Sequence, residues 1–130
     1  GIFNQSYYDL LIGMDATVFP SYYEPWGYTP LESVAFGVPT VTTTLSGFGQ
    51  WILSSFKNEF DDCGVSVIAR GDFNYNEVSE QIAQSLKYLV DCGATASASI
   101  SKAAMNTAKQ ASWSNFIEYY LEAFEIALKN

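Results

Sequence analysis

The sequence predicts an α/β fold in which helices flank a parallel β-sheet. Three short runs of apolar and β-branched residues have the length and composition of buried strands, and they occupy residues 16–20, 40–44 and 65–69. Segments with apolar residues at helical spacing lie between and after these runs. Strands that alternate with helices imply parallel pairing through right-handed crossovers.

The first elements lead to a loop and a helix start. Residues 4–13 are predicted to be helical because their aromatic and leucine side chains recur at helical spacing. The first strand ends at Pro20, which cannot donate a hydrogen bond to a ladder. Residues 21–28 then form a loop, and a helix runs from about residue 30 to residue 36.

Three further elements follow the second strand. Residues 46–49 are predicted to be a flexible turn, and residues 50–57 a helix. After the third strand, residues 76–90 have the pattern of an amphipathic helix. Its apolar side chains recur at intervals of three or four residues: Val78, Ile82, Leu86 and Leu89.

Two more helices are expected near the C-terminus. Residues 94–112 are rich in Ala, Ser and Thr, which predicts a helix with small side chains. Ser114 is a candidate N-cap for the last helix. Its apolar residues are expected to face the core: Ile117, Leu121, Phe124 and Leu128. Its acidic residues are expected to face water: Glu118, Glu122 and Glu125.

The number of strands indicates part of a larger unit. A doubly wound domain usually has about six strands, and this sequence predicts three. We therefore expect residues 1–130 to form a single partial domain, corresponding to the C-terminal half of such a domain. The first strand would then have an uncovered edge where the other half belongs.

The composition argues against several classes of function. With 48% hydrophobic residues the chain can build a core, and no apolar run reaches the length of about 18 residues that spans a membrane. A net charge of −8 and six scattered basic residues disfavour nucleic acid and anionic membranes as partners. The absence of histidine excludes a Ser-His-Asp triad and histidine-ligated metals. Cys63 and Cys92 lack metal-ligand spacing, so we expect no metal and two reduced thiols in a cytoplasmic protein.

The start of the helix near residue 30 predicts an anion site. Thr29 is a candidate N-cap, Pro30 suits the first helical position, and Glu32 would complete a capping box. Free N–H groups and the helix dipole favour an anion there, such as a diphosphate. Gly27 has no side chain, so the backbone can approach a ligand closely. The loop before this helix lies at the carboxyl end of a strand, where open α/β sheets bind ligands.

Two carboxylates belong to the same segment. Glu24 and Glu32 are separated by Pro25 and Gly27, which break a helix, so they would project from different places around one ligand. A carboxylate in a ligand cleft usually accepts hydrogen bonds from sugar hydroxyls. From the residues alone, Glu24 could also be a plain surface carboxylate and Glu32 a purely structural cap. Four aromatic residues could be core or could pack on a sugar or base: Tyr22, Tyr23, Trp26 and Tyr28.

The segment 18–49 resembles the C-terminal domain of glycogen synthases of the eukaryotic type. The resemblance is carried by Tyr-Tyr-Glu-Pro-Trp-Gly-Tyr-Thr-Pro from Tyr22, the Glu-x7-Glu pair, and Ser-Gly-Phe-Gly from Ser46; it returns around Trp113. These are retaining glycosyltransferases of the GT-B fold, similar to glycosyltransferase family 3. The resemblance implies a Rossmann-like parallel sheet flanked by helices, the C-terminal half of a GT-B nucleotide-sugar-binding domain. It also implies transfer of glucose from UDP-glucose to the non-reducing end of an α-1,4-glucan, with retention.

The resemblance also implies a role for individual residues. Glu24 would be the catalytic carboxylate, in contact with the hydroxyls of the transferred glucose or stabilising the oxocarbenium-like transition state. Glu32 would bind the ribose, and the backbone at the helix start would hold the diphosphate. The donor-binding residues would be Trp26, Gly27, Tyr28, Thr29 and Glu32. No metal or cofactor is implied, and UDP-glucose is a substrate.

The sequence departs from the family pattern in its positive charge. The basic residue nearest to Glu24 along the sequence is Lys57. The family's donor-binding Arg and Lys come from an upstream half-domain, and the acceptor site comes from an N-terminal domain. We therefore expect the isolated chain to be inactive and its missing N-terminal domain to be its main partner.

Other functions stay open from the residues alone. One is a GT-B glycosyltransferase with another donor or acceptor. Another is a non-catalytic module that binds a nucleotide sugar or a partner domain. A nucleotide-binding oxidoreductase is disfavoured, because no Gly-x-Gly-x-x-Gly follows a strand. The donor base, the acceptor and the oligomeric state, whether monomer or edge-paired dimer, are not determined by these patterns.

Overall fold

The computed structural model describes residues 10–11, 13–111, 122 and 125–129 of the chain. Its named elements are, in order, β1 (Thr17–Val18), α2 (Tyr28–Ala35), β2 (Thr40–Thr43), α3 (Gly47–Ser55), α4 (Phe60–Cys63), β3 (Val65–Ile68), α5 (Tyr75–Asp91) and α6 (Gly93–Gln110). The three predicted strands and the helices between them are therefore confirmed, with shorter strands than the sequence patterns predict.

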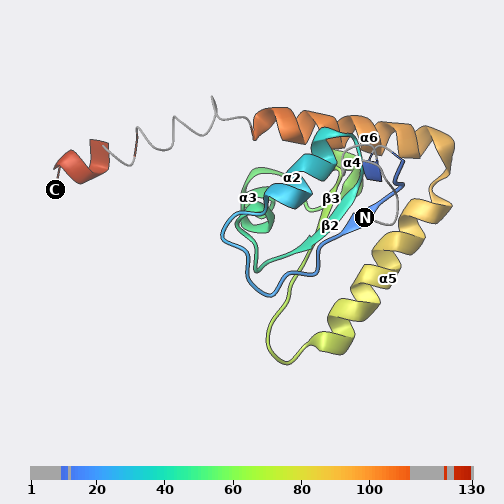
Figure 1. The fold of residues 1–130 in the computed structure, drawn as a ribbon, viewed down its shortest axis with the longest axis horizontal. Coiled ribbons are helices and arrows are strands. Elements are labelled where there is room, and N and C mark those ends of the chain that lie inside the picture. The colour runs from blue at the N-terminus through green and yellow to red at the C-terminus, as the bar shows by residue number, and fades with distance from the viewer. Residues whose placement is uncertain (1–9, 12, 112–121, 123–124, 130) are drawn as a thin grey trace.

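The strands form one parallel sheet in the order β1-β2-β3. Thr17 pairs with Thr40 in β2, and Thr40 in turn pairs with Val65 in β3. Helix α2 connects β1 to β2, and α3 with α4 connects β2 to β3, so each parallel pair has a helical crossover (Figure 1). Within the described part of the chain, β1 and β3 are the two edge strands.

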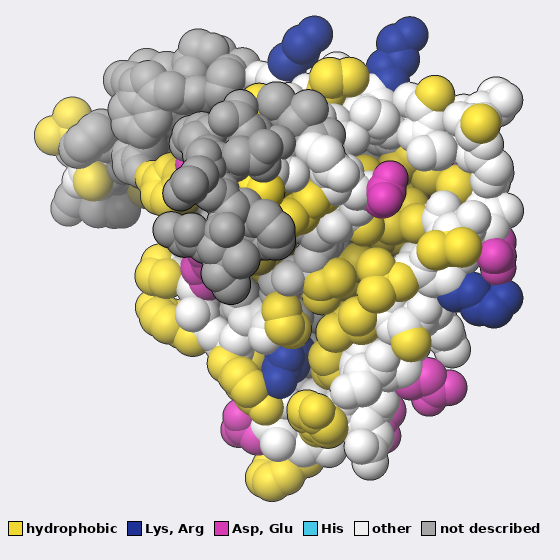
Figure 2. Space-filling model, turned by 45° about the vertical axis from the view of Figure 1, so that its right-hand side comes forward, with side chains coloured by type: hydrophobic (Ala, Val, Ile, Leu, Met, Phe, Trp, Pro, Cys, Tyr) yellow, Lys and Arg dark blue, Asp and Glu magenta, His cyan; other side chains and the backbone are white. Residues whose placement is uncertain are grey.

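Helices cover both faces of the sheet. Val65 and Val67 of β3 belong to one core cluster with residues of α2 and α3, whereas Ile68 points to the other face. There Ile68 packs with Val41 and with Val78 of α5. Burial of each such side chain contributes about 1.5–3 kcal/mol. Val78 is the one fully buried residue of α5, and Figure 2 shows apolar side chains gathered on the face where this helix lies.

Helix α6 lies across the end of the sheet where β2 and β3 begin (Figure 1). The hydroxyl of Thr107 donates to the carbonyl of Cys63, just before β3, over 2.8 Å. Gly64 is in the left-handed region, with φ of 72°, and packs directly against Ala104 of α6. Burial raises the pKa of the Cys63 thiol. Cys63 and Cys92 are both free, which confirms the prediction of two unpaired thiols.

At Val67 the edge of β3 is bonded to a side chain, and no further strand lies beside it among the described residues. The carboxamide nitrogen of Asn58 donates to the carbonyl of Val67 over 2.8 Å. The N–H of Val67 donates to the carboxamide oxygen of Asn58 over 2.7 Å. Because an amide side chain has the same donor and acceptor groups as a peptide, Asn58 imitates one residue of a neighbouring strand at this position.

Replacing Asn58 should therefore loosen this edge. We expect Asn58→Ala to lower the free energy of unfolding by about 1–2 kcal/mol, because two hydrogen bonds to the backbone are lost and water replaces them in part. Urea unfolding of the chain measures the change. Asn76→Ala, an exposed asparagine in α5, is the matched control and should stay within about 0.5 kcal/mol of the unsubstituted chain. Equal losses in both variants would contradict this role of Asn58.

Several local predictions are wrong or lie outside the described residues. Residues 46–49 are not a flexible turn: Ser46 caps α3, and its hydroxyl accepts a hydrogen bond from the N–H of Gly49 over 3.0 Å. The short helix α4 was not predicted, since four residues are too few to show a helical period.

The two terminal helices are described only in part. Most of the predicted helix 4–13, and the predicted cap at Ser114 with Ile117, Leu121 and Phe124, lie outside the described residues. Leu128 was expected to face the core, but its side chain is 87% exposed. Helical spacing shows that a helix has an apolar face and does not show what covers it. No described helix is long and apolar enough to cross a membrane.

Candidate functional site

The segments that follow the three strands meet at the carboxyl end of the sheet. The hydroxyl of Thr43, at the end of β2, donates to the carbonyl of Ser21 in the loop after β1, over 2.7 Å. The N–H of Arg70, which follows β3, donates to the hydroxyl of Thr44 over 3.1 Å. These bonds join all three strand ends into one surface, which is the position where open α/β sheets bind ligands.

Glu24 is held within this surface by its backbone and by its side chain. Its N–H donates to the carbonyl of Leu45 over 3.0 Å, and its carbonyl accepts from the N–H of Gly47 over 3.1 Å. Oε2 of its carboxylate accepts a hydrogen bond from the hydroxyl of Ser21 over 3.1 Å. Glu24 is half-buried. The carboxylate of Glu24 therefore has a hydrogen-bond donor in the same loop, and its catalytic role stays a prediction.

The helix after this loop begins earlier than the sequence predicts. Gly27, not Thr29, is the N-cap of α2, and no side chain caps the helix, so the expected capping box of Thr29 with Glu32 does not form. The reason is the backbone of Gly27, whose φ of 109° lies in the left-handed region and starts the helix directly after it. Pro30 then occupies the third helical position, where its missing N–H leaves no intrahelical bond unmade.

Gly27 brings the carboxylate and the helix start together. A methyl group added at Gly27 would lie 3.5 Å from the carboxyl carbon of Glu24 and 3.1 Å from Cγ of Pro30. The lack of a side chain at Gly27 thus leaves Glu24 beside the first turn of α2. The N–H groups of Tyr28 and Thr29 make no hydrogen bond with the described residues, and both residues are exposed. Glu32, half-buried in the second turn, completes the set of residues from this helix.

Trp26 has a structural role whether or not it also contacts a ligand. Its ring lies 6.1 Å from the ring of Phe48 in an edge-to-face arrangement, and 6.1 Å from that of Trp51. Its carbonyl accepts a hydrogen bond from the N–H of Phe48 over 2.6 Å. Trp51 packs in turn on Phe56 over 5.5 Å, so this aromatic cluster ties the loop to α3. A donor-binding role for Trp26 stays a prediction.

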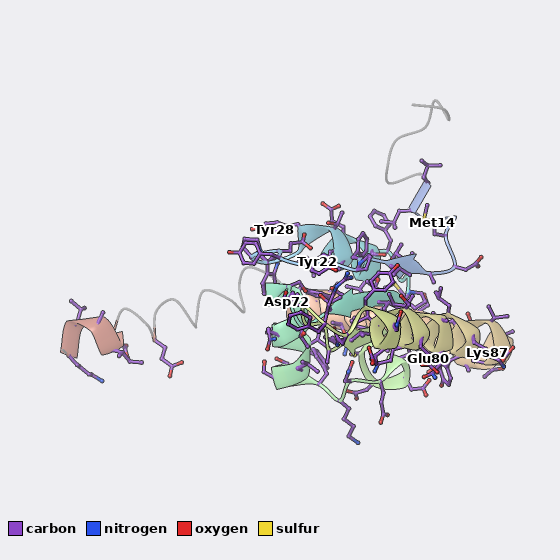
Figure 3. The ribbon with its side chains drawn as sticks, turned by 90° about the horizontal axis from the view of Figure 1, so that it is seen from below. Met14, Tyr22, Tyr28, Asp72, Glu80 and Lys87 are labelled. Carbon is purple, nitrogen blue, oxygen red and sulfur yellow. The ribbon has the colours of Figure 1, made fainter. Side chains whose placement is uncertain are left out.

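Arg70 is a basic residue beside the loop after β1, a position that the sequence did not predict. Nη1 of Arg70 donates to the carbonyl of Pro20 over 2.8 Å, and the guanidinium lies 3.7 Å from the centre of the Tyr22 ring. Figure 3 labels Tyr22 and Tyr28 of the segment between β1 and α2, and Asp72 in the segment that follows β3. Arg70 was missed because it is far from this loop in the sequence. The one available signal was its position directly after a predicted strand, at the same end of the sheet.

The comparisons with known proteins agree on one family. The sequence matches the family model described as glycogen synthase over residues 1–130. Glycogen [starch] synthase isoform 1 of Saccharomyces cerevisiae is 37% identical over 91 residues, which are 69% of this chain and 13% of that protein. The Caenorhabditis elegans glycogen [starch] synthase is 42% identical over 78 residues, which are 60% of this chain and 12% of that protein. The human liver protein is 60% identical over 43 residues, 33% of this chain and 6% of that protein.

The solved structures support the predicted fold. The chain is similar to WaaG, a glycosyltransferase involved in lipopolysaccharide biosynthesis, with a TM-score of 0.56 and 24% identity, over 78% of this chain and 24% of that chain. This likeness confirms the Rossmann-like α/β fold of the GT-B type. The match covers 13% or less of the length of the three relatives described above. The family model, which matches from the first residue to the last, shows that the chain belongs to the glycogen synthase family.

Proposed function

We propose that the chain is the C-terminal part of the nucleotide-sugar-binding domain of an enzyme that transfers glucose from UDP-glucose to the non-reducing end of an α-1,4-glucan, with retention of configuration. The observation that carries the proposal is the position of Glu24. Its carboxylate lies beside Gly27 at the start of α2, where a sugar and a diphosphate would both be within reach. We also propose that the enzyme is cytoplasmic, in keeping with two unpaired thiols.

The diphosphate would bind at the first turn of α2. The N–H groups of Tyr28 and Thr29 have no partner among the described residues, and the helix dipole adds partial positive charge at this end. Gly27 is itself buried, and Pro30, Phe48 and Glu24 surround the position of its absent side chain, so an oxygen of the phosphate would approach the exposed residues Tyr28 and Thr29. Each favourable charge interaction of this kind contributes about 0.3–1 kcal/mol when the site is exposed. Glu32, on the next turn, would accept hydrogen bonds from the ribose.

Glu24 would act on the transferred glucose. Ser21 already holds the carboxylate of Glu24, and two hydrogen bonds hold its backbone. Little free energy is therefore needed to reorient this carboxylate as positive charge develops on the sugar. It would accept hydrogen bonds from the hydroxyls of the glucose or stabilise the oxocarbenium-like transition state. Trp26 would support this loop through its aromatic cluster and border the donor. The reaction in this proposal uses no metal and no cofactor.

The remaining parts of the site would come from the rest of the parent protein. The edge of β1 has no neighbouring strand among the described residues, which is where an upstream half-domain would pair. That half would add positive charge around the diphosphate, and an N-terminal domain would bind the glucan. Loss of one such stabilising group costs about 10²–10³ in rate. The isolated chain is therefore expected to bind UDP more weakly than about 1 mM and to transfer no glucose.

The test compares the full-length parent enzyme with residues 1–130 alone. Transfer of labelled glucose to glycogen is measured with UDP-glucose and ADP-glucose as donors, and the anomeric configuration of the new bond is determined by NMR. We expect turnover with retention for the parent and none for residues 1–130. Turnover by residues 1–130 would contradict the incomplete site, and an inactive, nucleotide-binding parent would favour a non-catalytic module. UDP titration of residues 1–130 tests the helix start separately.

A further inference from the structure

Arg70 joins two loops that are far apart in the sequence. Its guanidinium donates to the carbonyl of Pro20 over 2.8 Å and lies 3.7 Å from the centre of the Tyr22 ring. We propose that Arg70 is a positioning residue for Glu24: it fixes the start of the loop that carries this carboxylate. The inference rests on the proposed function, in which Glu24 acts on the transferred sugar.

The route from Arg70 to Glu24 consists of short, named contacts. Pro20 and Tyr22, which the guanidinium of Arg70 contacts, flank Ser21 directly. The hydroxyl of Ser21 donates to Oε2 of Glu24 over 3.1 Å. The carbonyl of Ser21 is fixed on its other side by the hydroxyl of Thr43 over 2.7 Å. Arg70 therefore restrains both neighbours of the residue that orients the carboxylate.

The guanidinium group is suited to this position. Its planar edge can donate to a carbonyl while its face lies on an aromatic ring, and a lysine ammonium cannot do both in the same way. Arg70 is itself anchored by its N–H, which donates to the hydroxyl of Thr44 over 3.1 Å. The ion pair found in the described part of the chain joins Lys87 and Asp91, so the guanidinium of Arg70 forms no ion pair with a described carboxylate.

The contacts also explain why the loop needs such a restraint. The backbone of Glu24 is bonded to Leu45 and Gly47, and the backbone of Ser21 to Phe19 and to the hydroxyl of Thr43. Between these two anchored residues, Tyr22 and Tyr23 make no backbone hydrogen bond with the described residues. The ring of Tyr22 is 59% exposed, so burial alone does not fix this part of the loop. Without Arg70, Pro20 and Tyr22 would be less restrained, and Ser21 between them could move. The carboxylate of Glu24 would then lose a hydrogen-bond donor in a fixed position. A displacement of about 1 Å in a reacting group can cost 10²-fold in rate.

The experiment is a double-mutant cycle in the full-length enzyme. Arg70→Ala and Glu24→Gln are made separately and together, and initial rates of transfer from labelled UDP-glucose give kcat and KM. We expect Arg70→Ala to lower kcat about 10- to 100-fold with little change in the KM of the donor. In the Glu24→Gln background, the same substitution should change kcat less than about 2-fold, because the group that Arg70 positions is already altered.

Two further variants separate positioning from folding. Arg70→Lys should recover part of the lost kcat, since lysine can still reach the carbonyl of Pro20. Tyr22→Ala removes the exposed ring, should lower kcat about 3- to 10-fold, and should add little to the effect of Arg70→Ala. Lys57→Ala is the charge-matched control on the exposed segment after α3, and its kcat should match that of the wild type. Thermal unfolding is measured for every variant.

Several results would contradict the positioning role of Arg70 or the proposed function on which it rests. Wild-type kcat in Arg70→Ala overturns the proposal, and so does an equal fractional loss of kcat in both backgrounds, which would indicate lost folding or direct contact with the donor. A rise in the KM of the donor with unchanged kcat would also overturn it, since that result assigns Arg70 to substrate binding. If wild-type enzyme transfers no glucose, or Glu24→Gln retains full activity, the proposed function fails, and this inference fails with it.

Discussion

Glu24→Gln in the full-length enzyme is expected to lower kcat for glucose transfer by about 10²–10³-fold. Glutamine has nearly the same size and still accepts a hydrogen bond from Ser21, so the loop keeps its conformation. What is lost is the negative charge beside the position where positive charge develops on the sugar. Steady-state transfer of labelled glucose from UDP-glucose measures the change, and thermal unfolding shows whether the variant is folded.

Two carboxylates serve as controls for Glu24. Glu32→Gln should raise the KM of the donor several-fold and leave kcat within about 10-fold of the wild type, because ribose binding is the same in the ground state and the transition state. Glu80→Gln, on the exposed face of α5, should have wild-type kinetics (Figure 3). If Glu24→Gln changed only KM, Glu24 would be a binding residue and its catalytic role would be refuted.

Gly64→Ala is expected to give the largest loss of stability, about 2–4 kcal/mol in the free energy of unfolding. Gly64 has a φ of 72°, which an L-residue adopts at a cost. A Cβ at this position would also lie 2.4 Å from Cβ and 2.6 Å from Cα of Ala104. Because these atoms belong to the body of α6, the helix itself would have to move away from the start of β3. Urea unfolding of the chain, followed by tryptophan fluorescence, measures the loss.

Gly93→Ala is the matched variant for this prediction. Gly93 also has a positive φ, 83°, but a Cβ there would have no atom within 4 Å. The cost of its left-handed backbone alone is about 1 kcal/mol. The difference between the two variants therefore measures the packing of α6 against Gly64, separately from backbone strain. Equal losses in Gly64→Ala and Gly93→Ala would show that this contact contributes nothing.

The sequence predicts the strands and long helices well because their signals are local. The apolar β-branched runs lie at β1, β2 and β3, and the spacing of Val78, Ile82, Leu86 and Leu89 gives α5 to within one residue at each end. The start of α2 was predicted two residues late. Thr29 has the side chain of a good N-cap, but the left-handed backbone of Gly27 decides where the helix begins, and spacing does not reveal a dihedral angle.

The candidate site was predictable only where it is continuous in the sequence. Glu24, Gly27, Tyr28 and Thr29 follow one another closely, so a motif can identify them. Arg70 could not be assigned to the same site, because its contact with Pro20 depends on how the ends of β1 and β3 are placed in the sheet. Burial of the aromatic face of Trp26 against Phe48 and Trp51 likewise depends on the packing of α3.

Helix α6 and the candidate site lie at opposite ends of the sheet, so substitutions in the two regions should have different phenotypes. Contacts of α6, such as Thr107 with Cys63, lie where the strands begin, whereas Glu24 and Arg70 lie where the strands end. Alleles that alter the α6 contacts should be temperature-sensitive, with low protein abundance and normal kinetics in the enzyme that remains folded. Alleles at Glu24 should leave abundance normal and abolish glycogen accumulation at every temperature. A globally stabilising second-site substitution should therefore rescue the first class of alleles and leave the second class unchanged.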